Sequence, residues 1–203
     1  SLVITIRNAF FNKLFVRRGC LYTTTDVNGT WTIIPNAGDN TTSVGYTFHE
    51  LLPGESRSTS GTTHDVTGEV TVDGGTLTAG NVTVDVNGLQ TDVEKRDINV
   101  RRTILHTDDY PTATFTVNTP VDITDVPDNG EPGTVEVTGM LNLHGAEKEV
   151  TAKFDVLRTG NRLVIAGTVP INRIDFGVET PDFVAAKVDE DGELNIRLAM
   201  EKR

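Results

Sequence analysis

The feature that most constrains this chain is a regular alternation of apolar and polar side chains in short segments from residue 30 onward. A period of two places successive side chains on opposite faces of an extended strand, so each segment predicts a half-buried β-strand. Valine and threonine dominate these segments, and β-branched residues suit a pleated sheet. The nine segments are TWTII, SVGYTFH, HDVTGEVTV, GNVTVDVNGL, TATFTV, VEVTGMLNL, KEVTAKFDV, RLVIAGTVPI and ELNIRLAM.

The connections between the segments are mostly short and rich in glycine, asparagine and aspartate, as in DGGT, RTGN and DEDGE. Such turns join neighbouring antiparallel strands. At 203 residues, the chain is long enough for one domain of this kind. We therefore predict an all-β fold over residues 30–203, an extended up-and-down antiparallel barrel of about eight strands. Residues 1–29 form a separate N-terminal segment.

Two local irregularities sharpen this prediction. The stretch LNLHGAEKEV, residues 141–150, places His144 and Gly145 between two alternating runs. Because Gly145 can adopt the positive φ that a tight hairpin needs, we interpret His144 as a turn residue. Within TLTAGNVTVDV the apolar phase changes, which predicts a β-bulge at Gly80–Asn81.

One segment, TDVEKRDINVRRTIL, lacks the β pattern. Thr91 and Glu94 have the spacing of a capping box, and Arg101 and Arg102 lie where basic residues favour the end of a helix. The segment carries an incomplete apolar stripe, enough to lie over an apolar surface on one side. We predict one short helix over about residues 92–105 that partly covers the sheet.

The net charge of −11 restricts the partners of this chain. Residues 1–22 contain four basic side chains and no acidic one, so the remainder carries −15. A strongly acidic body repels phosphate backbones, and we expect no nucleic acid partner. The single cysteine, Cys20, excludes an intrachain disulfide and a cluster of thiolate metal ligands.

The N-terminal segment is apolar and basic. Arg7 and Lys13 interrupt it well short of the roughly 18 to 20 apolar residues that span a bilayer. It also lacks the uninterrupted apolar centre of a signal peptide. Three interpretations stay open: an ordinary strand or helix, the flank of a membrane anchor, and a segment that lies on a membrane surface.

The four histidines give no signature of catalysis or of metal binding. No two of them lie within five residues of each other, so the paired spacing of a helical zinc site is absent. A Gly-x-Ser-x-Gly elbow is absent as well. One enzymatic alternative stays open, a hydrolase acting on a lipid or sugar, with two of His49, His106 and His144 beside Asp97 or Asp108 at the barrel mouth.

The inward face of the predicted sheet consists mostly of valine, alanine and glycine. A closed barrel of about eight strands encloses a space that side chains just fill or that holds one small ligand. Small inward side chains favour a hollow, and strands of about ten residues make it roughly 30 Å long. Such a hollow selects an elongated apolar molecule, since each buried CH₂ contributes about 0.8 kcal/mol. The alternative is a filled core in a scaffold that only contacts partners.

The order of the segments resembles that of the YceI-like family of lipid-binding proteins. The resemblance runs from residue 30 to the C-terminus, through GTWTI, TSVGYTFHELL, TDVEKRDINVR, TDDYPTATF, VTGMLNLHG and INRIDFG. Each block alone is weak, and their combination is specific. The chain departs from the family at NTTSVGY, where many members have a His-Ser pair.

The resemblance implies a lipocalin-like barrel that binds a polyisoprenoid, an isoprenoid quinone or a similar long-chain lipid without catalysis. It implies no cofactor and no metal ion, and a location outside the bacterial cytoplasm, with a membrane anchor ahead of the barrel in some relatives. A homodimer is a further expectation. From the apolar phase of the strands, the expected lining residues are Val44, Tyr46, Phe48, Val66, Val70, Val82, Val84, Phe115, Val117, Leu141, Ala152, Phe154, Ile165, Ile196 and Leu198. Polar contacts at the mouth are expected from His49, Arg96, Asp97 and His144.

Overall fold

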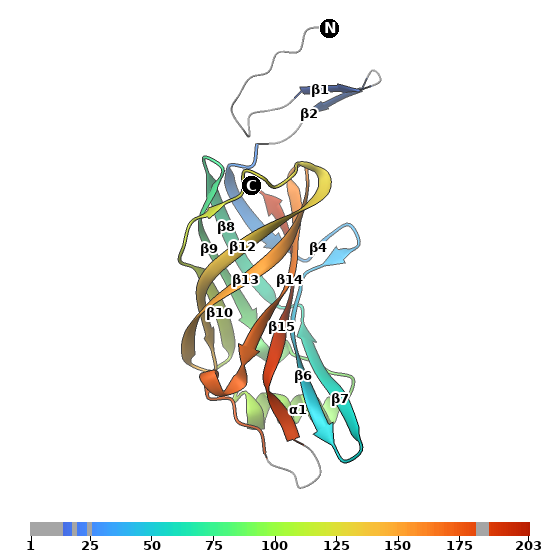
Figure 1. Cartoon of the computed structure of the whole chain (residues 1–203), viewed down its shortest axis with the longest axis vertical. Helices are drawn as coiled ribbons and strands as arrows, with labels where there is room; N and C mark the ends of the chain where they lie inside the picture. Colours follow the sequence, from blue (N-terminus) through green and yellow to red (C-terminus); the bar gives the residue numbers. More distant parts are fainter. Residues whose placement is uncertain (1–13, 18–19, 24–25, 182–186) are drawn as a thin grey trace.

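The barrel wall is a closed ring of eight antiparallel strands, seen with its long axis vertical in Figure 1. The computed structural model describes residues 14–17, 20–23, 26–181 and 187–203. This architecture confirms the predicted all-β barrel. Around the ring, the strands are β3 (Gly29–Ile34), β8 (Val66–Asp73), β9 (Thr76–Asp85), β10 (Thr112–Val117), β12 (Asn129–Leu143), β13 (Ala146–Thr159), β14 (Arg162–Asn172) and β15 (Lys187–Lys202).

Two further strands extend the wall at one end, the lower end in Figure 1. β6 (Ser43–Leu52) pairs with the first part of β15, and β7 (Glu55–Thr63) pairs with β6. The last part of β15 pairs with β3 instead, which closes the ring. β7 is absent from the nine predicted strands because its sequence, ESRSTSGTT, has no apolar alternation.

Short elements complete the chain. β4 (Asn36–Ala37) pairs with β5 (Asn40–Thr41), β11 (Val121–Asp122) pairs with β9, and β1 (Leu14–Arg17) pairs with β2 (Cys20–Thr23). The interpretation of the N-terminal segment as an anchor flank lies largely outside the described residues. Within the residues that are described, no helix has the length and apolar character needed to cross a membrane.

The turn between β12 and β13 confirms the interpretation of His144. Leu143 pairs with Ala146, which leaves His144 and Gly145 as a two-residue connection. Their φ angles are 55° and 74°, and positive φ at both positions defines the turn that matches the twist of a β-hairpin.

The predicted bulge exists but lies two residues earlier than expected. The register of β9 against β8 shifts at Thr78 and not at Gly80–Asn81. Gly80 pairs with Val70 in the regular ladder, and a Cβ at Gly80 would lie 3.0 Å from a Val70 methyl carbon. Gly80 therefore allows close packing inside the barrel, and the bulge at Thr78 changes which side chains of β9 face inward.

The predicted helix is present in two parts. α1 (Glu94–Asn99) continues into η2 (Val100–Ile104), one turn of π-helix, at the lower end of the barrel (Figure 1). The proposed capping box was wrong, because Val93 precedes the helix and Thr91 bonds elsewhere. The Thr91 amide and hydroxyl donate to one Asp97 carboxylate oxygen at 2.7 and 2.6 Å. Two short turns of 3₁₀ helix, η1 (Val86–Gly88) and η3 (Arg173–Phe176), also border this end.

The opposite end is closed by large side chains. Trp31 and Met200 are fully buried, and they pack with Val27, Val72 and Leu163. The indole nitrogen of Trp31 donates to the carbonyl of Val27 at 2.8 Å. The last residues of the chain lie here as well (Figure 1), where the Arg203 amide donates to the carbonyl of Thr30 and the Lys202 ammonium donates to that of Asp26.

Candidate binding cavity

A cavity of about 420 Å³ occupies the barrel between the closed end and α1. This volume lies in the range of about 300 to 1,000 Å³ that is typical of small-molecule sites. On β15 alone, its lining extends from Val188 to Leu198, a span of up to about 33 Å along an extended strand. The cavity is therefore long, and the strands that surround it give it a wall of mostly aliphatic side chains.

The structure places almost every predicted lining residue at this cavity. Val66 is the exception, because it is buried in a cluster with Val84 and Leu198 and does not border the space. The predicted residues that do border it are Val44, Tyr46, Phe48, Val70, Val82, Val84, Phe115, Val117, Leu141, Ala152, Phe154, Ile165, Ile196 and Leu198. Alternation along the strands thus selects the inward face from sequence.

The wall aromatics lie against glycines of neighbouring strands. Phe48 covers Gly192, its direct partner on β15, so closely that a Cβ at Gly192 would overlap the phenyl ring. A Cβ at Gly139 would lie 2.5 Å from the Phe115 ring, and one at Gly167 would lie 2.8 Å from the Phe154 ring. Each ring can occupy the space that a side chain would fill, so the rings follow the wall and leave the centre of the barrel open.

The helical segment supplies lining residues that the strand pattern alone does not predict. Asn99, Val100, Ile104 and Leu105 border the cavity from α1, η2 and the residue that follows. Val100 and Ile104 are four residues apart, which places them on one face of a helix. The incomplete apolar stripe in the sequence is the signal for this cover.

The charged side chains of the lining gather at the α1 end. They are Glu50 on β6, Arg96 on α1 and Arg173 on η3. Arg96 also forms an ion pair with Asp92, with 2.6 Å between Nη1 and Oδ1. Toward the other end, the lining includes Val70 and Leu77, which belong to the apolar cluster of Trp31 and Met200, so the cavity has a polar end and an apolar end.

Arg173 shapes the polar end through the backbone. Its guanidinium is buried and donates to three carbonyl oxygens, those of Val178, Val188 and Asp189, at 2.9, 3.2 and 3.1 Å. These carbonyls belong to the residues after η3 and to the start of β15. Because one side chain fixes both segments, they keep a constant separation on this side of the cavity.

Tyr46 stands between the apolar wall and this polar end. Its hydroxyl oxygen is buried and has no hydrogen-bond partner among the described residues. Burial raises the pKa of the Tyr46 phenol to about 12, and the nearby carboxylates of Asp97 and Glu50 add to the effect while Arg96 opposes it. Tyr46 is therefore a neutral hydrogen-bond donor at physiological pH.

Asp97 is a buried carboxylate held by its own segment. The Thr91 hydroxyl and amide donate to it and lower its pKa, and the charges of Arg101 and Arg96 act in the same direction. Asp97 does not border the cavity. It anchors the start of α1, which in turn carries Arg96 to the lining.

The other polar residues predicted at the mouth lie elsewhere. His49 is exposed on β6, with its ring 3.1 Å from the Ser58 hydroxyl, and His144 lies in the β12–β13 turn. His106 and His144 approach each other, with ring centroids 5.5 Å apart, but neither borders the cavity. Asp108 is exposed. The described residues therefore present no histidine and aspartate pair facing the cavity.

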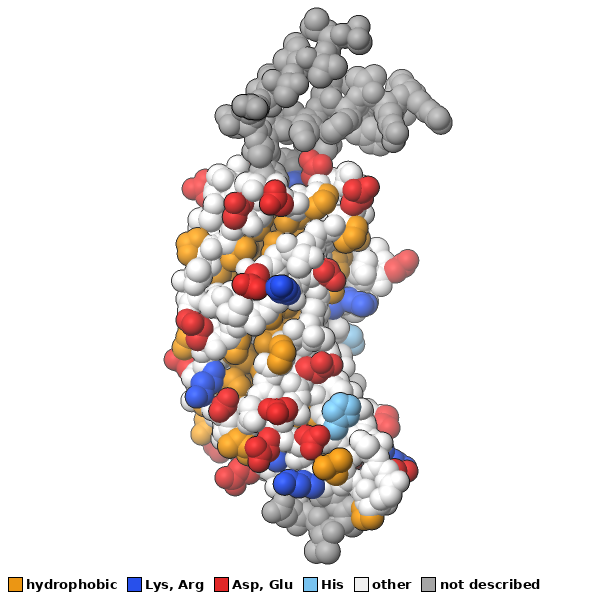
Figure 2. All heavy atoms as spheres, in the orientation of Figure 1, with side chains coloured by type: hydrophobic (Ala, Val, Ile, Leu, Met, Phe, Trp, Pro, Cys, Tyr) orange, Lys and Arg blue, Asp and Glu red, His pale blue; other side chains and the backbone are white. Residues whose placement is uncertain are grey.

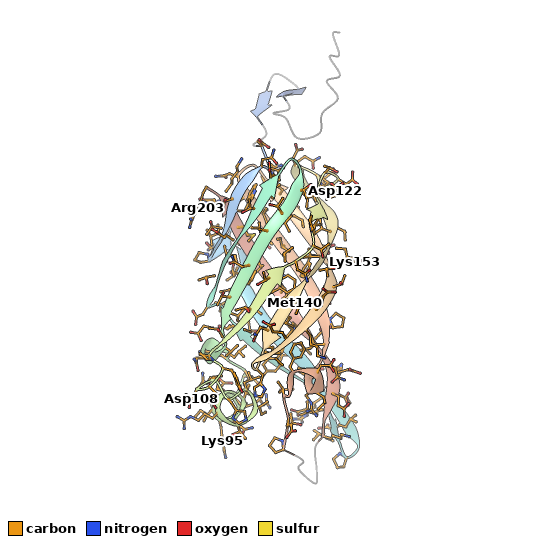
Figure 3. All side chains as sticks on the ribbon, turned by 90° about the vertical axis from the view of Figure 1, so that its left-hand side faces the viewer. Lys95, Asp108, Asp122, Met140, Lys153 and Arg203 are labelled. Carbon is orange, nitrogen blue, oxygen red and sulfur yellow. The ribbon has the colours of Figure 1, made fainter. Side chains whose placement is uncertain are left out.

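A closed antiparallel barrel with a long apolar cavity and a short helical cover defines a lipocalin-like class of fold. Figure 3 shows the side chains on this barrel, and Figure 2 shows acidic side chains spread over its outer surface. The chain belongs to the YceI-like domain family, because the family model matches residues 31–200.

Comparisons with known proteins agree with this assignment. A UPF0312 protein of Pseudomonas paraeruginosa is 32% identical over 105 residues, which are 48% of this chain and 51% of that protein. The match thus spans about half the length of this curated relative.

Solved structures share the fold at low identity. A polyisoprenoid binding domain from Saccharophagus degradans superposes with a TM-score of 0.65 at 19% identity, over 85% of this chain and 98% of that one. BcnA of Burkholderia cenocepacia gives a TM-score of 0.61 at 20% identity, over 78% and 94%. The YCEI protein of Campylobacter jejuni gives 0.54 at 18% identity, over 70% and 84%.

Proposed function

We propose that this protein binds one long-chain apolar lipid, a polyisoprenoid or isoprenoid quinone, inside the barrel and carries or sequesters it without catalysis. The observation that supports this most strongly is the long cavity with an aliphatic wall, charged at one end only. The polyisoprenoid binding domain from S. degradans has the same fold. Family membership and cavity shape thus favour the same class of ligand.

The energy of binding follows from the wall. Each CH₂ that leaves water contributes about 0.8 kcal/mol, so a five-carbon isoprene unit contributes up to about 4 kcal/mol. A chain that fills the cavity therefore binds through burial of its apolar surface, with no need for a charged anchor. A chain that is too short leaves part of the cavity empty and binds more weakly.

The distribution of polar groups gives the bound lipid a direction. We place the end of the tail against Val70 and Leu77, beside the cluster of Trp31 and Met200, because burying a polar head there without partners costs several kcal/mol. The head then lies near Glu50, Arg96 and Asn99, which border the polar end of the cavity. The phenol of Tyr46 and the guanidinium of Arg96 offer donors to oxygen atoms of such a head.

Location and anchoring are part of the same proposal. We place the protein outside the cytoplasm and held near a membrane, as the family resemblance implies. Cell fractionation with protease treatment of intact cells tests this. The proposal predicts that protease removes the protein from intact cells or that it appears in the envelope fraction, and protection in the cytoplasmic fraction contradicts it.

Mass spectrometry of organic extracts from the purified protein tests lipid binding directly. We expect a long apolar molecule in near-stoichiometric amount, or its uptake when polyprenols and quinones are offered. Ala152→Trp places an indole in the cavity and should abolish uptake while circular dichroism keeps the β signal. Lys153→Trp is the matched control, because the neighbouring residue is exposed on the outer face of the same strand (Figure 3).

Either of two results contradicts the proposal. One is the repeated absence of any lipid after polyprenols and quinones have been offered. The other is equal uptake by the Ala152→Trp and Lys153→Trp variants, because the cavity would then play no part in binding.

A further inference from the structure

Two histidines from distant parts of the chain meet beside the cavity. His106 follows η2, and His144 lies in the β12–β13 turn, with 5.5 Å between the ring centroids. Within the described residues, they are the two non-glycine residues with positive φ, 49° and 55°. Each conformation has a local cause, because His106 directly follows the C-cap of η2 and His144 lies in the hairpin turn. The two turns bring the imidazole rings together, which makes the pair a candidate site.

The hydrogen bonds of His144 leave one ring nitrogen available. Nδ1 lies 3.1 Å from the carbonyl oxygen of Phe176, so in the neutral ring Nδ1 carries the proton and donates it. Nε2 then holds a lone pair. Nε2 is buried and has no hydrogen-bond partner among the described residues. A buried polar atom without a partner is costly, and a bound water or ion is a common reason for it.

This is the arrangement that metal-binding histidines adopt. They donate one ring N–H to a backbone carbonyl or carboxylate, which orients the ring, and they bind the ion through the other nitrogen. Two imidazoles that bind one tetrahedral ion at about 2.1 Å have ring centroids about 5 Å apart. The observed separation of 5.5 Å matches this spacing.

Space for further ligands lies on the side of His106. A second pocket of about 300 Å³ adjoins His106 and is also lined by Thr103, Gly177, Glu179, Thr180 and Pro181. Among the described residues, no group of three or more histidine, cysteine, aspartate or glutamate side chains is arranged around an ion. The protein would therefore supply two ligands, and water would complete the coordination of an ion held there.

We propose that His106 and His144 together bind a divalent transition metal ion. Zn²⁺, Cu²⁺ and Ni²⁺ are the candidates, because imidazole nitrogen suits these ions. His106 comes directly after Ile104 and Leu105, and His144 comes directly after Leu143, all of which border the cavity. An ion held by both rings would connect the helical cover to the barrel wall. The site does not depend on lipid binding.

Isothermal titration of Zn²⁺ into the metal-free full chain, without a histidine tag, tests the site. His106→Asn and His144→Asn remove one ligand each, and asparagine tolerates positive φ better than most residues. We expect one equivalent of Zn²⁺ in the wild type and at least tenfold weaker binding in either variant. His49→Asn, on the exposed surface of β6, is the matched control and should bind as the wild type does.

Electron paramagnetic resonance of the Cu²⁺ complex gives a second measurement on the wild type, so the test does not rely on the variants being folded. The proposal requires two nitrogen ligands in the wild type and one in each folded variant. Fewer than two nitrogens in the wild type, or equal Zn²⁺ affinity in all four proteins, would overturn it. The lone pair of His144 would then be bound by an ordered water.

Discussion

The two ends of the barrel share most of their strands but are packed in opposite ways. At the closed end, Trp31 and Met200 fill the interior completely, and Arg158 lies over the indole ring at 5.6 Å. Toward α1, most of the lining side chains are small and aliphatic, and the aromatic rings lie against glycines. The barrel geometry is common to both ends, so the size and placement of side chains decide where space remains.

This difference in packing gives the two ends different roles. At the filled end, contacts within the protein stabilise the fold, whereas at the open end the side chains gain the same packing energy only when a ligand is bound. Along β15, Ile196, Leu198 and Met200 face inward in succession, and they pass from partly buried beside the cavity to fully buried. β15 thus passes from the open region to the filled region of the barrel within five residues.

The largest effect is expected when one side chain is removed from the filled region of β15 and another from its open region. Met200→Ala leaves a new void in a filled region and should lower the free energy of unfolding by about 2 to 5 kcal/mol. Ile196→Ala only enlarges an existing cavity and should cost less than half as much. Urea denaturation of the lipid-free protein measures both, and equal losses would show that the two ends are packed alike.

The next effect tests whether a glycine keeps the centre open. Gly192→Ala places a methyl group where the Phe48 ring lies, so the ring must turn into the cavity. Lipid affinity should fall about ten- to a hundredfold, which is about 1.4 to 2.8 kcal/mol. The double variant with Phe48→Ala should regain most of the affinity. A fluorescence competition assay with a labelled polyprenol measures this, and no rescue in the double variant would refute the role of the ring.

A smaller effect concerns pH and Tyr46. Because the folded protein raises the pKa of the Tyr46 phenol from 10.0 to about 12, the resulting stabilisation is complete below pH 10 and decreases as the pH rises toward 12. Between pH 8 and pH 11, the free energy of unfolding of the wild type should fall by about 1 kcal/mol more than that of Tyr46→Phe. Denaturation at both pH values measures the difference, and parallel losses would contradict the assignment.

The smallest expected change in the free energy of unfolding comes from substitution of Arg158 at the closed end. Burial lowers the pKa of Arg158, and one of its guanidinium nitrogens has no partner among the described residues. Arg158→Met keeps the packing over Trp31 and removes a buried charge, so the free energy of unfolding should change by less than about 1 kcal/mol or rise. Thermal denaturation decides this, and a loss of 3 kcal/mol or more would show that the charge itself stabilises the closed end.

Most of the barrel could be predicted because its strands repeat a local pattern. The alternation of side chains identifies each inward face without knowledge of the neighbouring strand. β7 could not be predicted, because its serines, threonines and glycine lack an apolar phase and its position depends on pairing with β6. The capping box failed for a related reason, since the Thr91 side chain bonds to Asp97 in the next turn.

The candidate site was predictable in its apolar part and less so in its polar part. Valines such as Val82 and Val84 follow from the alternation, whereas the contact between His106 and His144 depends on two turns that are far apart in sequence. Arg158 continues the inward phase of Phe154 and Val156, so the sequence held a signal for a buried cation at the closed end. That signal is readable once charged residues are included in the inward face.

The position of the C-terminus has a practical consequence. Arg203 lies at the filled end, far along the barrel from α1. A linker attached there therefore holds α1 and the polar end of the cavity away from the surface to which the protein is tethered. Immobilised in this way on a sensor or a bead, the protein presents the polar end of its cavity to the surrounding solution while it stays attached.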